Sequence, residues 1–134
     1  MTLIQGSKGC FAAGTQILIG DGSKAIQDVR VGELVWTFND EGVLSQQEVT
    51  ETHTHEDQSL LVYRLWGGIE LKVTDNHWVL TENNTFAEIG KLSRNNCLVN
   101  LHDELLPIVS IDKGSRETVY NLTVAVNHTY IANG

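Results

Sequence analysis

The sequence predicts an all-β domain, and three observations lead to that expectation. Apolar residues fall in many short runs, and most of the runs end in Gly, Asn or Asp residues typical of turns. Gly67-Gly68 separates two such runs by two residues, which is a strong hairpin signal. The helical candidates are short. With 134 residues and 41% hydrophobic content, the chain suits one compact domain, sandwich-like or barrel-like.

Each strand is predicted from an apolar or β-branched run followed by a turn. The first run leads into Gly20-Asp21-Gly22-Ser23, and the second ends at Asn39-Asp40-Glu41-Gly42. The only helical candidates are Lys24–Val29 and Phe86–Leu92. In chain order, the predicted strands are Gln16–Ile19, Glu33–Phe38, Leu60–Trp66, Ile69–Thr74, His77–Leu80, Cys97–Leu101, Ile108–Asp112, Val119–Val124 and Thr129–Ile131.

Net charge and composition limit which partners and which cellular location are expected for the protein. The net charge is -8 and acidic residues are spread along the chain, which argues against a nucleic-acid partner because such binding needs a basic surface. No apolar run is long enough to span a membrane, and the first nine residues lack a signal-peptide core. We therefore expect a cytoplasmic protein whose two cysteines are free thiols.

A weak internal repeat relates the two halves of the chain. Val62-Tyr63-Arg64-Leu65 recurs as Val119-Tyr120-Asn121-Leu122, and Asn76-His77-Trp78 recurs as Asn127-His128-Thr129. Segment 26–35 also partly echoes segment 87–92. No linker separates the halves, so they are expected to form one intertwined domain with an Asn-His pair from each half near a pseudo-two-fold axis.

Cys10 is the strongest candidate for chemistry. It lies just before the first predicted strand, and its neighbour Gly9 has no side chain to shield its own carbonyl. A thiol there can reach the carbonyl of its upstream peptide bond, which indicates self-processing. Cysteine needs a base or a lowered pKa to react, and histidine is the natural partner. His77 lies in the polar turn Thr74-Asp75-Asn76-His77, which can direct a hydroxyl and an imidazole to one point.

Four segments together resemble the Hint superfamily, which includes inteins, bacterial intein-like domains and hedgehog autoprocessing domains. Their order and spacing cover Cys10 to Gly134, and they look closest to bacterial intein-like domains or phage-encoded mini-inteins. The segments are Cys10-Phe11-Ala12-Ala13-Gly14-Thr15-Gln16-Ile17, Asp28-Val29-Arg30-Val31-Gly32-Glu33-Leu34-Val35, Thr74-Asp75-Asn76-His77, and Val119 to Val124 with Asn127 to Gly134.

The resemblance implies a horseshoe-like fold with pseudo-two-fold symmetry and a single-turnover, autocatalytic reaction. It places the scissile bond at Gly9-Cys10, where an N-to-S acyl shift would form a thioester. Thr74 would orient the scissile group, His77 would act on the departing amide nitrogen, and His128 would serve later proton transfers. Asn121 stands where many inteins carry an aspartate, so only hydrogen bonding is expected of it. No cofactor or metal is implied, and the partner is the chain's own flanking polypeptide.

The resemblance also divides the chain. Residues 1–9 are expected to be an upstream flank, whose Gly/Ser/Lys content suits a flexible segment, and residues 10–134 the Hint domain. The domain is expected to lack its last strand and the terminal His-Asn motif, because Asn133-Gly134 suits a hairpin turn better. We therefore expect N-terminal cleavage by water or thiol without complete splicing, and a separate C-terminal fragment if the domain is split.

Other functions stay open at this stage. One is a non-catalytic β-domain of a phage or bacterial protein with an inert cysteine, and another is a Cys-His hydrolase of the protease type. The latter usually places its nucleophile at a helix start, whereas Cys10 precedes a strand. The spacing of His53 and His55 puts both imidazoles on one strand face, which is either half a metal site or a solvated surface.

Overall fold

The computed structural model describes residues 2–5, 9–38, 42–100 and 102–132. Almost every element is a strand, as predicted. The elements are β1 (Thr2–Gln5), β2 (Phe11–Ala12), β3 (Gln16–Ile19), β4 (Gly22–Ala25), the 3-10 turn η1 (Ile26–Asp28), β5 (Leu34–Phe38), β6 (Leu44–Leu65), β7 (Ile69–Val73), β8 (Trp78–Leu80), β9 (Phe86–Glu88), the 3-10 turn η2 (Ile89–Lys91), β10 (Cys97–Val99), β11 (Leu105–Val124) and β12 (Thr129–Ala132).

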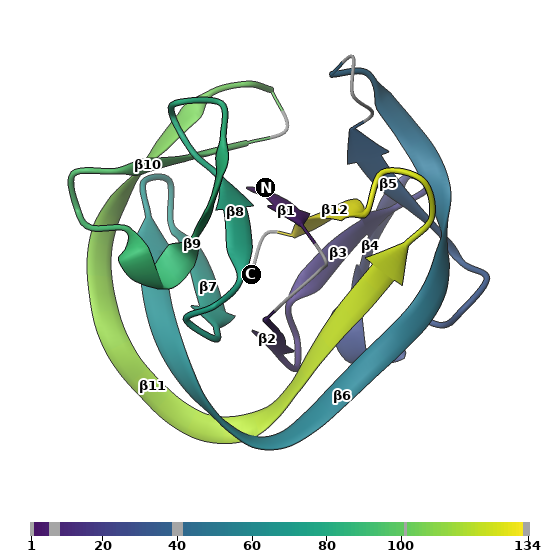
Figure 1. Cartoon of the computed structure of the whole chain (residues 1–134), viewed down its shortest axis with the longest axis horizontal. Helices are drawn as coiled ribbons and strands as arrows, with labels where there is room; N and C mark the ends of the chain where they lie inside the picture. The colour runs from purple at the N-terminus through teal and green to yellow at the C-terminus, as the bar shows by residue number, and fades with distance from the viewer. Residues whose placement is uncertain (1, 6–8, 39–41, 101, 133–134) are drawn as a thin grey trace.

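Two long, curved strands give the molecule its horseshoe shape (Figure 1). Strands β6 and β11, of 22 and 20 residues, pair antiparallel along most of their length from Ile108↔Leu65 to Val124↔Val49. Register shifts interrupt the ladder, and such bulges increase local bending. The sequence predicted shorter, separate strands here, because the polar stretches 44–59 and 113–118 lack the apolar alternation that marks a half-buried strand.

The strands form two six-stranded sheets. Their orders are β4-β3-β12-β1-β8-β9 and β10-β11-β2-β7-β6-β5. The hairpin predicted at Gly67-Gly68 is present, with both glycines at positive φ and Leu65 paired with Ile69. The turn expected at Asn133-Gly134 and the end of the strand expected at Leu101 lie outside the described residues.

The two predicted helices are wrong. In each place a short strand leads into a single 3-10 turn, since β4 pairs with β3 and β9 pairs with β8. The two turns are equivalent: the Ile26 N–H donates to Thr15 O and the Ile89 N–H donates to His77 O, each at 2.8 Å. The internal repeat read from the sequence therefore corresponds to repeated local structure.

The larger of two buried clusters in the described residues packs inside the horseshoe and supports the site, and the smaller one contains Cys10, Ala12, Leu60 and Val119. Phe11, Ile17, Tyr63, Leu71 and Tyr130 are each at most 1% exposed. The Tyr63 hydroxyl donates to Ile89 O at 2.8 Å, which ties β6 to η2 beneath the site. None of the helical turns in the described part of the chain has the length and hydropathy needed to cross a bilayer.

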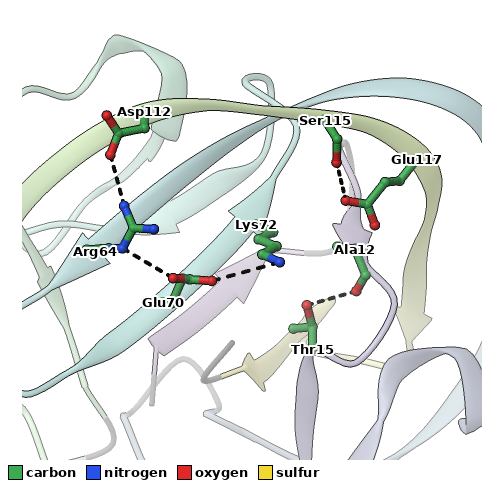
Figure 2. Close-up of polar contacts among 8 residues, drawn as sticks. All are labelled: Ala12, Thr15, Arg64, Glu70, Lys72, Asp112, Ser115 and Glu117. Atoms are coloured by element: carbon green, nitrogen blue, oxygen red, sulfur yellow. Dashed lines mark hydrogen bonds and ion pairs between the residues drawn. The ribbon is translucent and has the colours of Figure 1, made fainter.

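Ion pairs brace the outer surface where β6, β7 and β11 run together (Figure 2). Arg64 lies between Asp112 on β11, at 2.9 Å, and Glu70 on β7, at 3.3 Å. Lys72 extends the chain of charges to Glu70 at 4.0 Å. Because these groups are half exposed, each pair contributes at most about 1 kcal/mol and the buried cluster dominates stability.

The upstream segment also belongs to a sheet. Strand β1 pairs with β12 on one side and β8 on the other. The expectation of a flexible segment is therefore wrong for residues 2–5. The division into a flank at residues 1–9 and a domain at 10–134 stays a prediction about chemistry.

Candidate functional site

Cys10 is held by Thr74 at the junction of β2 and β7. The Cys10 N–H donates to Thr74 Oγ1 at 2.8 Å, and the Thr74 N–H donates to the Cys10 carbonyl at 2.9 Å. The Thr74 hydroxyl in turn donates to Asn76 Oδ1 at 2.8 Å. The nitrogen of the Gly9-Cys10 peptide is thus fixed by a hydroxyl whose own orientation is set by a neighbouring amide.

Gly9 lies directly against His77. Its φ is +83°, a left-handed conformation that favours glycine. A Cβ at this position would lie 2.6 Å from His77 Cα and 2.7 Å from His77 N, well inside van der Waals contact. Only glycine lets the peptide bond at residues 9 and 10 approach the histidine this closely.

The turn that carries Thr74 and His77 is supported from behind by η2. The Gly90 N–H donates to Asp75 O at 2.8 Å, and the Ile89 N–H donates to His77 O at the same distance. A Cβ on Gly90 would lie 2.6 Å from Asp75 O, so this contact also requires glycine. The repeated turn therefore holds the turn of residues 74–77 in place.

His77 is fully buried and its hydrogen bonds define its tautomer. Its ring lies 4.6 Å from the Phe11 ring, and its Nε2 lies 3.3 Å from the Tyr130 hydroxyl. That hydroxyl donates its only proton to Asn121 Oδ1 at 2.6 Å, so Nε2 must carry the hydrogen that it shares with Tyr130. Nδ1 is then unprotonated and carries a lone pair, which has no hydrogen-bond partner among the described residues.

Burial controls the charge of the His77 imidazole and of the Cys10 thiol. It lowers the pKa of His77 to about 3, so the imidazole is neutral at pH 7. It raises the pKa of the Cys10 thiol to about 11, so the thiol is protonated. The resting site therefore contains an uncharged acid and an uncharged base.

The site opens into a cleft of about 1030 Å³. Of the residues predicted from sequence, Gly9, Cys10, Thr74, Asn121 and His128 line it, whereas His77 lies behind. The structure brings Cys10 together with Thr74, and His77 with Asn121 through Tyr130. His128 makes no hydrogen bond within the described ranges. His53 and His55 also line the cleft, but His53 Nε2 lies 2.8 Å from Thr123 Oγ1, and the described residues contain no group of three potential metal ligands.

Solved structures of known proteins share this arrangement of strands. The bacterial intein-like domain from Clostridium thermocellum superimposes with a TM-score of 0.87 at 30% identity, over 95% of this chain and 94% of that one. The gp41-1 intein gives a TM-score of 0.81 at 25% identity, over 95% of both chains. The DnaB intein from Synechocystis sp. PCC 6803 gives 0.85 at 22% identity, over 94% of both, which supports the fold alone. No protein-family model and no curated relative matches the sequence.

The chain belongs to the bacterial intein-like domains of the Hint superfamily. The predicted fold class, the horseshoe-like Hint fold, is confirmed. So is the general function, a self-processing or protein-splicing domain. The roles of individual site residues stay predictions.

Sequence reasoning missed Tyr130 as part of this intein-like site. Tyr130 belongs to the segment Asn127 to Ile131 that suggested the family, but its link between His77 and Asn121 depends on the packing of β12 against β11. Asn76 was visible within the turn motif, although its hydrogen bond to Thr74 was not. The sequence indicated Tyr130 and Asn76 only in that both lie inside segments that suggested the family.

Tyr130→Phe is expected to destabilise the domain by about 1–3 kcal/mol, because the His77 N–H would lose its buried acceptor. Equilibrium denaturation at pH 7 would measure the change. The matched control is Tyr120→Phe, since the Tyr120 hydroxyl makes no hydrogen bond within the described part of the chain. Equal effects of the two substitutions would show that the bridge through Tyr130 is not a stabilising element.

Proposed function

We propose that this domain cleaves its own chain at Gly9-Cys10 through an N-to-S acyl shift. The Cys10 sulfur attacks the Gly9 carbonyl carbon, the C–N bond breaks, and the products are a thioester and a free Cys10 amine. The main support for the proposal is that the Gly9-Cys10 peptide bond is held on both of its sides. Thr74 holds its nitrogen, and the backbone of His77 packs against Gly9.

The proton balance assigns a role to His77. The thiol must lose a proton as sulfur attacks, and the departing nitrogen must gain one. The unpartnered Nδ1 lone pair of His77 can accept the first proton and return it to the nitrogen. With pKa values near 11 and 3, a free thiolate–imidazolium pair would cost on the order of 10 kcal/mol, so proton movement is coupled to attack.

The remaining groups orient the reaction and serve its later steps. Thr74 holds the amide nitrogen while the carbonyl carbon changes geometry, which favours one direction of attack. Asn121 fixes Tyr130 and hence the histidine tautomer. His128 lines the same cleft and would transfer protons when water or an added thiol attacks the thioester. The substrate is the domain's own upstream segment, and a reducing cytoplasm would keep Cys10 free to react.

Cys10→Ala is expected to abolish cleavage at Gly9-Cys10, because no other group replaces the sulfur nucleophile. Intact-mass spectrometry after addition of a small thiol would measure release of residues 1–9. Cys97→Ala is the matched control and should cleave like the unmodified chain. Continued cleavage in Cys10→Ala would refute the thioester route. A folded wild-type chain that never cleaves would instead favour a non-catalytic β-domain.

A further inference from the structure

The segment upstream of the proposed scissile bond forms a strand in the interior of a sheet. Strand β1 pairs antiparallel with β12 at four positions, from Thr2↔Ala132 to Gln5↔Thr129. On its other side it pairs with β8 at Ile4↔Val79 and Gln5↔Trp78. Figure 1 shows β1 beside β12, in the opening of the horseshoe between its two arms.

Strand β1 is the link between two halves of its sheet. In the order β4-β3-β12-β1-β8-β9, no pairing joins β12 to β8 directly within the described residues. If β1 left, both neighbours would expose unpaired backbone N–H and C=O groups. Ile4 and Gln5 pair with β12 and β8 at once, so the slot offers backbone hydrogen-bonding groups on both sides.

Cleavage at Gly9-Cys10 would separate β1 from the domain without touching any of its pairings. The bond lies between β1 and β2, and the strand contacts all lie upstream of Gly9. Addition of a strand to exposed sheet edges is an established way of binding extended peptides, in which main-chain hydrogen bonds supply the affinity. Here both edges of the added strand would be satisfied.

We propose that the slot between β12 and β8 is a binding site for an extended peptide, and that after cleavage the released peptide stays bound there through residues 2–5, antiparallel to both strands. The inference rests on the proposed function for the cleavage event. In the thiol reaction, the added thiolate attacks the Gly9 thioester carbonyl and the bond to Cys10 sulfur breaks. Cys10 regains a thiol proton, and the peptide becomes a thioester of the added thiol, still held as a strand.

The test follows the peptide after thiol-induced cleavage of the whole chain. Mercaptoethanesulfonate starts the reaction, mass spectrometry identifies the 1–9 thioester, and native size-exclusion chromatography shows where it elutes. We expect it to elute with the domain and to separate only in denaturant. Ile4→Pro removes an N–H from the paired strand and should raise the free fraction at least about tenfold, whereas Ile4→Val should not.

The outcomes separate this inference from the proposed function. Cleavage followed by elution of free wild-type peptide overturns the binding slot and leaves the thioester chemistry intact. If nothing cleaves, the proposed function fails, and hydrogen exchange on the intact wild-type chain tests the slot. The amides of Leu3, Ile4 and Gln5 should be protected, and exchange at free-peptide rates would overturn the inference without relying on any variant's folding.

Discussion

Gly9→Ala is expected to slow cleavage of the upstream segment about a hundredfold. The new methyl group would lie 2.6 Å from His77 Cα, a backbone atom that cannot swing aside like the end of a flexible side chain. The left-handed φ of +83° adds about 1–2 kcal/mol of strain for a residue with a side chain. Relief requires the residue 9–10 peptide to move away from His77, and a displacement of about 1 Å can cost on the order of a hundredfold in rate.

Gly14→Ala is the matched control for that experiment. Gly14 has a φ of +89°, nearly that of Gly9, but a Cβ there would meet no atom within 4 Å. The control therefore carries the backbone strain without the collision. Single-turnover cleavage rates, compared at equal folded fraction by circular dichroism, should fall about a hundredfold in Gly9→Ala alone. Equal rates in both variants would mean that close packing of Gly9 on His77 is unnecessary for the reaction.

Short-range signals predicted much of the fold. The Gly67-Gly68 turn fixed a hairpin, and turn residues marked most strand ends. The continuity of the long strands β6 and β11 was harder to infer, because residues 44–59 and 113–118 are mostly polar and, apart from the buried Val49, exposed or half-buried. Residues 44–48 form a strand because they pair with β5, residues 49–59 because they pair with β11, and residues 113–118 because they pair with β6. These are long-range contacts without an apolar pattern. Residues 24–29 and 86–92 were misread as helical for a related reason: pairing with β3 and β8 outweighs local preference.

The site was partly predictable. Motif order indicated Cys10, Thr74 and His77, because their chemistry depends on residue type and local turn geometry. The sequence does not show that His77 is completely buried or that the Tyr130 hydroxyl links His77 to Asn121 by hydrogen bonds. Those features arise where β12 packs against β11. Similarly, β1 is a strand that pairs with β12 and β8, and residues 2–5 alone do not specify these long-range partners.

His77→Leu is expected to flatten the acid side of the stability curve. The unfolded histidine titrates near pH 6.5, whereas burial lowers its folded pKa to about 3. Above pH 6.5 both states are neutral and stability is complete. As the pH falls from 6.5 to 3, only the unfolded state gains the proton, so unfolding becomes more favourable by about 5 kcal/mol in total. That is a large part of the roughly 5–15 kcal/mol available to a domain of this size.

Denaturant unfolding of both proteins between pH 7 and pH 3 isolates this contribution, because other titrating groups cancel in the difference between the two curves. The wild-type chain should lose stability relative to His77→Leu steadily below pH 6.5. Replacement of the exposed His102 by Leu should leave the wild-type curve unchanged. Parallel curves for wild type and His77→Leu would mean that residue 77 binds a proton as readily in the folded chain as in the unfolded one.

The same leucine variant should fold at pH 7 yet cleave at least about a hundredfold more slowly, because leucine cannot carry the proton from sulfur to nitrogen.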